Sequence, residues 1–107
     1  MSDLTFLVTV EAHIETEATS HRTMEDIIRH CQWHDGIHLQ DIDELSMEGP
    51  TEATAHIAIS VPLSGDFDED ECEEIIREEL MGEEFGVCRG FLLITQVFEV
   101  VPFERRD

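Results

Sequence analysis

A cluster of residue types that bind zinc, with three histidines and one cysteine, lies between residues 30 and 38 of the 107-residue chain. His30 and His34 are four residues apart, so on one helix they would share a face, as two zinc ligands can. His38 or Asp35 could supply a third ligand. Cys31 stands where the HExxH zinc signature has its Glu, and histidines near the C-terminus of a helix are favourable without any metal. We therefore expect no cofactor, with His30, His34 and His38 as the ligands if a metal is bound.

A second group of histidines and carboxylates falls on alternate positions of two predicted strands. His13 and His56 point to the same side of the sheet as three glutamates: Glu11, Glu15 and Glu52. Such His–Glu pairs mostly stabilise a sheet, although histidine also titrates near neutral pH. A catalytic pair would need a pocket, and the sequence contains no glycine-rich phosphate loop and no GxSxG motif. We predict that the protein is not an enzyme.

The charge of the chain excludes several classes of partner. Six Arg, no Lys and 26 acidic residues give a formal net charge of −20. Because nucleic-acid backbones and anionic membranes are also negative, we expect no direct binding to either. The chain shows no apolar run of the roughly 18 residues that a membrane span needs, and no signal-peptide pattern. Three cysteines without a CxxC spacing indicate a reducing, cytoplasmic location rather than a disulfide framework.

The acidic residues are concentrated between residues 66 and 84, where eleven acids and one Arg give a net charge of −10. Acids are favourable at the start of a helix, but Glu78 and Glu79 fall at the opposite end, where negative charge is unfavourable. Like charges four residues apart also cost about 0.2–0.5 kcal/mol for each pair. The segment is therefore more acidic than stability favours. We expect it to contact a partner through Asp70, Glu73, Glu74, Arg77, Glu78, Glu79 and Glu83.

Three explanations of this acidity are open. The first is a solvated face that keeps the protein soluble. The second is adaptation to high salt, which screens self-repulsion; the lack of Lys fits it, whereas 17 Glu against 9 Asp and ten Ile fit it less well. The third is imitation of nucleic acid by carboxylates about 5–6 Å apart along a helix.

In size, charge and the placement of its acidic helix, the chain resembles the small acidic DNA-mimic inhibitors that phages and mobile elements use against restriction or CRISPR systems. The resemblance implies a basic nucleic-acid-binding protein as the partner, bound through charge complementarity. It rests on no motif, so no functional residue is transferred from it. The main alternative is a salt-adapted regulatory or structural domain whose acids face solvent, and a metal-binding protein built on the histidine cluster is the third.

The elements that must position these residues follow from the spacing of the apolar side chains. Alternation predicts three strands, at residues 4–14, 37–47 and 53–63, and a long apolar stretch predicts a fourth at residues 91–103. In the second strand the alternation slips near Asp41, which indicates a bulge in an edge strand. The first and third strands alternate most regularly, so we expect them at the centre of the sheet.

Two helices are expected between these strands. Thr23 and Asp26 resemble a capping box for the first helix, which Gly36 would end. Asp68 would cap the second helix, and Gly82 would end it. The order predicts a single α+β domain over residues 1–107. Its expected architecture is the ferredoxin-like βαββαβ sandwich, a four-stranded antiparallel sheet with both helices on one face.

The last predicted strand would be an edge of that sheet, yet it is apolar on both faces. An exposed apolar edge invites association unless it is covered. We therefore expect a homodimer or a partner contact through Phe91, Leu93, Val97 and Val101. The alternative is that the loop at 83–89 and the C-terminal tail cover the strand.

Overall fold

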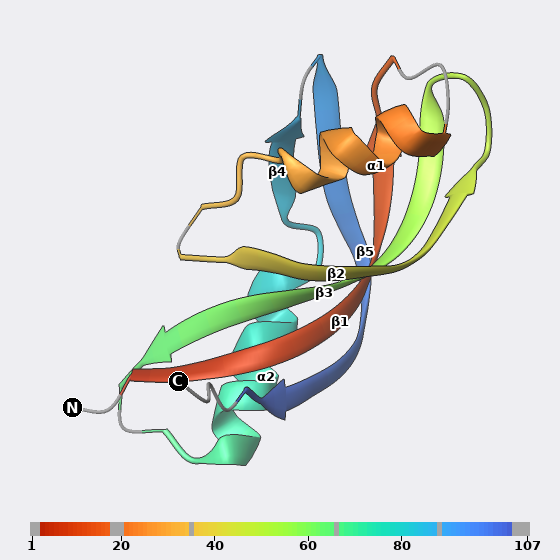
Figure 1. The fold of residues 1–107 in the computed structure, drawn as a ribbon. Helices are drawn as coiled ribbons and strands as arrows, with labels where there is room; N and C mark the ends of the chain where they lie inside the picture. Colours follow the sequence, from red (N-terminus) through yellow and green to blue (C-terminus); the bar gives the residue numbers. More distant parts are fainter. Residues whose placement is uncertain (1–2, 18–20, 35, 66, 88, 104–107) are drawn as a thin grey trace.

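A computed structural model describes residues 3–17, 21–34, 36–65, 67–87 and 89–103 of the chain (Figure 1). Within these ranges the chain forms five strands and two helices. Their bounds are β1 Asp3–Glu15, α1 His21–Arg29, β2 His38–Met47, β3 Glu52–Ser64, α2 Glu69–Leu80, β4 Glu84–Val87 and β5 Gly90–Pro102. In this described part of the chain, neither helix has the length and apolar character needed to cross a membrane.

The five strands form one antiparallel sheet in the order β2-β3-β1-β5-β4. β1 and β3 are neighbours inside the sheet, as expected, and they pair along the whole of β1. Each has a strand on both sides, which explains why their alternation is the most regular. The four-stranded ferredoxin-like sandwich is wrong, because β4 adds a fifth strand on the far side of β5.

The extra strand occupies the segment that the sequence predicts to be a loop. β4 pairs with β5 from Glu84 opposite Leu93 to Val87 opposite Gly90. Phe85 is its one fully buried side chain among four residues, so the strand is too short for periodicity to reveal it. The β4–β5 hairpin lies next to β1 through its second strand, because β5 pairs with β1 and β4 forms the edge of the sheet.

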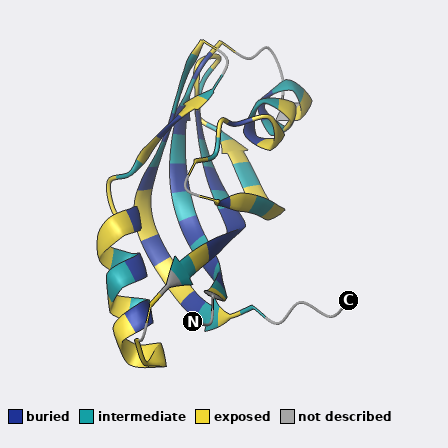
Figure 2. Cartoon of the chain, turned by 90° about the vertical axis from the view of Figure 1, so that its left-hand side faces the viewer, coloured by how far each residue is buried: buried dark blue, intermediate teal, exposed yellow. Residues whose placement is uncertain are grey.

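One hydrophobic core lies between the sheet and the helices, and buried positions alternate with exposed ones along the strands (Figure 2). On β1 the even-numbered residues from Phe6 to Ile14 are buried. Both helices add buried residues to the same cluster: Met24, Ile28, Cys72, Ile76 and Leu80. The helices therefore cover one face of the sheet. We call the other side, which carries the odd-numbered residues of β1 from Thr5 to Glu15 and the residues paired with them, the open face.

Helix α1 differs from the sequence prediction at both ends. It begins two residues before Thr23, which therefore lies inside the helix and does not cap it. It ends at Arg29 rather than at Gly36, which has a φ of 77° in the connection that follows. After the helix, the N–H of Gln32 donates to the carbonyl of Gly86 on β4 at 2.9 Å. After α1 the chain thus pairs with β4, a strand that the sequence pattern does not predict.

Helix α2 and strand β2 follow the sequence predictions. Asp68 caps α2, because its carboxylate accepts a hydrogen bond from the N–H of Glu71 at 2.9 Å. Gly82, with a φ of 79°, follows the end of the helix. β2 is an edge strand with a register shift between Leu39 and Asp41, where a bulge was expected, and with a second shift further along.

Strand β5 lies between β1 and β4 in the sheet, so the expectation that it is the edge strand is wrong. Two register shifts interrupt its pairing with β1. Because of these shifts, the residues of β5 that face the core do not keep a strict alternation. Val97 is 7% exposed and belongs to the core, whereas Phe98 is 41% exposed. Beyond β4, the outer edge of β5 continues into contact with the turn after α2, since the N–H of Gly82 donates to the carbonyl of Ile94 at 2.9 Å.

Candidate binding surfaces

Helix α2 presents carboxylates to solvent along the side opposite the core. It contacts the core through three buried residues: Cys72, Ile76 and Leu80. At about 100° per residue the opposite side carries Asp70, Glu74 and Glu78, and all three are exposed. In the part of the chain that the structure describes, none of these three carboxylates forms an ion pair. We call Asp70, Glu74 and Glu78 the acidic row.

Two other residues of the predicted partner contact face strand β5. Nη1 of Arg77 donates to the carbonyl of Val97 at 2.8 Å, and Nη2 donates to the carbonyl of Phe98 at 3.2 Å. Glu73 holds the same guanidinium, with Nη2 3.1 Å from its Oε1. These carbonyls belong to the part of β5 that β4 does not reach. Arg77 therefore closes the sheet edge there, a role that requires knowledge of the topology and has no signal in the sequence.

The last two acids of the predicted contact have different surroundings. Glu79 is exposed. Glu83 is half-buried; its carboxylate lies 3.3 Å from Nε2 of His34, and its carbonyl accepts from the N–H of Ile94 on β5 at 3.0 Å. A protein approaching α2 therefore meets the acidic row and Glu79, with Glu83 at the margin.

The three histidines of the predicted metal site do not share a helix face, because α1 ends before His30. Nδ1 of His30 lies 2.8 Å from the carbonyl oxygen of Asp26. The ring of His34 stacks on Phe85 with ring centroids 4.5 Å apart. His38 lies on β2 and lines a cavity. The expected helical geometry is wrong, and the three rings have different neighbours.

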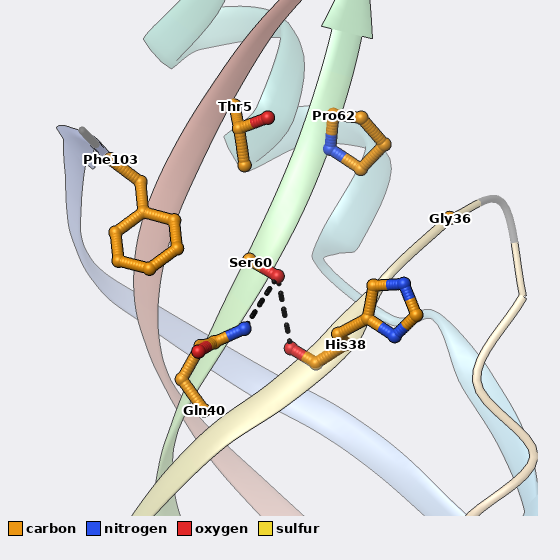
Figure 3. A pocket seen from close by; sticks show the side chains of 7 residues that line it. All are labelled: Thr5, Gly36, His38, Gln40, Ser60, Pro62 and Phe103. Atoms are coloured by element: carbon orange, nitrogen blue, oxygen red, sulfur yellow. Dashed lines mark hydrogen bonds between the residues drawn. The ribbon is translucent and has the colours of Figure 1, made fainter. Parts of the chain in front are cut away.

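The cavity beside His38 has a volume of about 410 Å³ and lies between β1, the start of β2 and the end of β3 (Figure 3). Its lining consists of seven residues: Thr5, Gly36, His38, Gln40, Ser60, Pro62 and Phe103. Ser60 is the buried polar residue among them; its hydroxyl accepts from Nε2 of Gln40 at 2.9 Å and donates to the carbonyl of His38 at 3.4 Å. The volume suits a small molecule. The buried hydroxyl of Ser60, however, already donates one hydrogen bond and accepts another within the protein, so it indicates no particular ligand.

The apolar residues predicted to contact a partner are separated by the register shifts of β5. Phe91, Leu93 and Val101 are half-buried on the open face. Val97 lies in the core instead. Phe98 is exposed and its ring lies edge-on to that of His56, with centroids 5.2 Å apart. The apolar surface left for a partner is thus part of the open face and not a strand edge.

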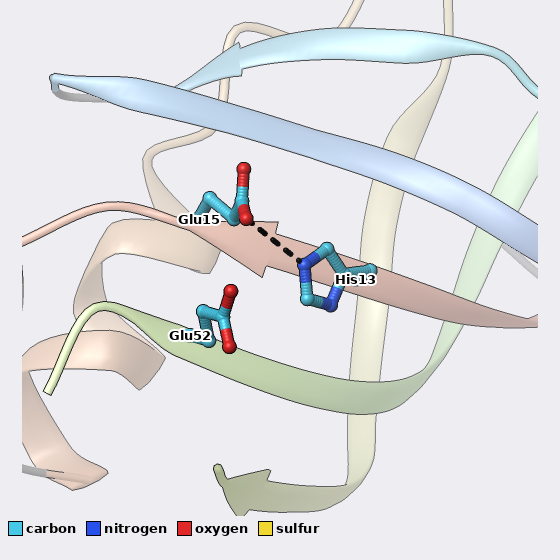
Figure 4. A group of neighbouring side chains, drawn as sticks. All are labelled: His13, Glu15 and Glu52. Atoms are coloured by element: carbon cyan, nitrogen blue, oxygen red, sulfur yellow. Dashed lines mark ion pairs between the residues drawn. The ribbon is translucent and has the colours of Figure 1, made fainter. Parts of the chain in front are cut away.

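The polar patch expected on β1 and β3 also lies on the open face. Nε2 of His13 is 3.6 Å from Oε1 of Glu15, and Glu52 is directly opposite Glu15 on β3 (Figure 4). One ligand atom from each of these three side chains lies within 4.8 Å of the others, and among the described residues this is the one such group. His56 approaches Glu44 of β2 instead, at 3.7 Å. Alternation predicts the shared face, but the meeting of these three residues depends on the strand register.

The two described cysteines, Cys31 and Cys72, are free and buried. Burial raises the pKa of the Cys31 thiol to about 12. Burial also raises the pKa of Cys72, with a further contribution from the nearby acidic side chains. Both thiols are thus kept protonated, which does not suit a nucleophile. Cys88 lies outside the described residues.

Comparisons of the chain with protein-family models, with curated proteins and with solved structures find no match. The function is therefore inferred from the surfaces themselves. Three of these surfaces have side chains suited to binding another molecule or an ion. They are the acidic row, the apolar residues of the open face, and the group formed by His13, Glu15 and Glu52.

Proposed function

We propose that the protein is a non-enzymatic, acidic binding protein that occupies the nucleic-acid site of a basic protein. The observation that supports this proposal is the acidic row, whose three exposed carboxylates form no ion pair in the described part of the chain. The one Arg of α2 is turned toward β5 and neutralises Glu73. The charge of the row is therefore available to cationic side chains of another molecule.

The partner would be a protein that contacts phosphates through Arg and Lys. From Asp70 to Glu78 the row extends about 12 Å along the helix, at 1.5 Å per residue. Opposite charge accelerates the encounter, and affinity falls as salt is raised. Inhibition results from occupation of the site without any chemical step, as for the phage and mobile-element inhibitors that imitate DNA. We place this action in the cytoplasm, where Cys31 and Cys72 remain reduced.

Capture from an extract of the native host tests the proposal. The immobilised protein is expected to retain one basic nucleic-acid-binding protein, which excess DNA displaces. With that partner purified, a double charge reversal, Glu74→Arg with Glu78→Arg, should weaken binding at least about tenfold, because it removes two of the three charges in the row.

The matched control reverses two exposed acids that lie outside α2 and outside the residues that define the open face, Asp26→Arg with Asp43→Arg, and changes the net charge by the same amount. It should leave binding nearly unchanged. Equal weakening by both double variants would show that total charge matters and that the row does not. A partner that DNA cannot displace would contradict imitation of nucleic acid.

We also propose that two copies of the chain associate through the open face. Phe98 is exposed there, and Phe91 and Leu93 are half-buried on the same side of β5. Light scattering during size-exclusion chromatography is expected to give twice the chain mass, and Phe98→Ser should return it to one. A wild-type mass of one chain at high protein concentration would overturn this part of the proposal.

A further inference from the structure

Glu15 and Glu52 face each other across β1 and β3 at the end of the open face. The N–H of Thr16 donates to the carbonyl of Thr51 at 2.9 Å, so the neighbouring Glu15–Glu52 pair is of the non-hydrogen-bonded type. In such pairs the two side chains are closest, and like charges placed directly opposite destabilise the sheet. Arg89, from the adjoining turn, pairs with Glu17 instead. Among the described residues no Arg neutralises the two facing carboxylates.

His13 completes the arrangement two positions before Glu15 on β1, where side chains again point to the open face. Its Nε2 lies 3.6 Å from Oε1 of Glu15, and the carboxylate of Glu52 is turned toward the same space (Figure 4). The three ligand atoms are within 4.8 Å of one another. Zinc ions bind nitrogen and oxygen ligands at about 2.0–2.2 Å, so small rotations of two exposed or half-buried glutamates bring all three onto one ion.

We propose that His13, Glu15 and Glu52 form a binding site for a divalent transition-metal ion, with Zn²⁺ as the ion that best suits the ligands. An imidazole ligand favours Zn²⁺ over Mg²⁺ and Ca²⁺, and the two carboxylates balance the charge of the zinc ion. The ion removes the repulsion between Glu15 and Glu52. Three protein ligands leave one tetrahedral position for water or for a donor from another molecule. A hollow of about 390 Å³, lined in part by Glu15, Thr51 and Arg89, provides space beside the site. The proposal is independent of the function assigned to α2.

Isothermal titration calorimetry with Zn²⁺ tests the site on the full chain after treatment with a chelator. The buffer contains about 0.15 M KCl and excess Mg²⁺, which occupy the diffuse cation atmosphere of an acidic protein. We expect one Zn²⁺ per chain, with Glu52→Gln and His13→Ala each weakening binding at least about tenfold. Glu52 is exposed, so Glu52→Gln keeps the test valid even if His13→Ala disturbs the sheet.

The control pair is His56 with Glu44, which lies on the same sheet and is more exposed than His13 with Glu15, and which lacks a second carboxylate in the group. Glu44→Gln changes the charge by the same amount as Glu52→Gln and should leave the zinc affinity unchanged. The absence of heat from wild-type protein would overturn the proposal. Equal weakening by Glu44→Gln and Glu52→Gln would also overturn it, because that result indicates diffuse attraction of cations.

Discussion

Gly90 lies where the β4–β5 hairpin approaches β1 so closely that no side chain fits. A Cβ at this position would be 1.8 Å from the carbonyl oxygen of Glu15 and 2.9 Å from Cβ of Thr16. The obstacle is backbone, which cannot rotate away as a flexible side chain can. We predict that Gly90→Ala lowers the free energy of unfolding by about 2 kcal/mol or more, as overpacking does, measured by urea denaturation.

Gly49 provides the control for this substitution, because a Cβ there would meet nothing within 4 Å. Gly49→Ala should change the free energy of unfolding by less than about 0.5 kcal/mol. If Gly90→Ala were as stable as Gly49→Ala, the close approach of the hairpin to β1 would be incorrect.

Cys31 makes the free energy of unfolding vary with pH in the alkaline range. The thiol is buried, and its pKa is about 12 in the folded chain against an ordinary value of 9.0. Well below pH 9 the thiol is protonated in both states, so it adds no pH dependence there. Between pH 9 and 12 the unfolded chain loses this proton and the folded chain keeps it, so the free energy of unfolding falls as pH rises.

We predict that the free energy of unfolding of the wild type falls between pH 8 and pH 10 by about 1 kcal/mol more than that of Cys31→Ala. Urea titrations in a reducing buffer at both pH values measure the difference. Parallel pH dependence of the two proteins would show that Cys31 ionises equally in both states.

Among the elements, α2 has a structural role in addition to its acidic surface, because it closes the edge of the sheet through Arg77. Two backbone carbonyls of β5 accept hydrogen bonds from one guanidinium, which a lysine cannot reproduce with the same fork. We predict that Arg77→Lys lowers the free energy of unfolding by about 1–2 kcal/mol. Arg29→Lys, which alters an exposed pair with Glu25, should cost less than about 0.5 kcal/mol. Similar losses in the two variants would remove the edge-closing role from Arg77.

The elements also show where sequence reasoning works and where it fails. β1, β3 and α2 are recovered because each combines a long apolar pattern with a clear end, such as the cap at Asp68. The end of α1 is missed because Gln32 pairs with Gly86, a contact between distant segments. β4 is missed because four residues carry too little pattern.

The candidate sites also divide into features that a local sequence pattern predicts and features that depend on contacts between distant segments. Alternation places His13 and Glu15 on one face, and helical spacing places Glu74 and Glu78 on one side of α2, so both surfaces can be predicted from local pattern. The split of Val97 from Phe91 and Leu93 depends on the register shifts in β5. The engagement of Arg77 depends on which strand α2 lies beside, and no local pattern contains that information.

At the scale of the whole molecule, a net charge of −20 must be held in a compact chain. Screening relieves such repulsion mainly at moderate salt, because the Debye length falls from about 10 Å at 0.1 M to about 3 Å at 1 M. We predict that the thermal midpoint rises from about 0.05 to 0.5 M KCl and changes little above that concentration. A steep rise that continues to about 2 M would instead indicate salt adaptation, with the acids of α2 serving solvation alone.

The pairing of the first and last strands also determines how the protein must fold. β1 lies between β3 and β5, and Phe6 pairs with Pro102, nearly the whole chain away. Topologies dominated by such distant contacts fold slowly, since a large loop must close before the contacts stabilise it. During synthesis, β1 would have one side without a neighbour until β5 has emerged. A nascent chain that lacks β5 would therefore expose a long apolar strand, and it is at this stage that the protein most needs a chaperone.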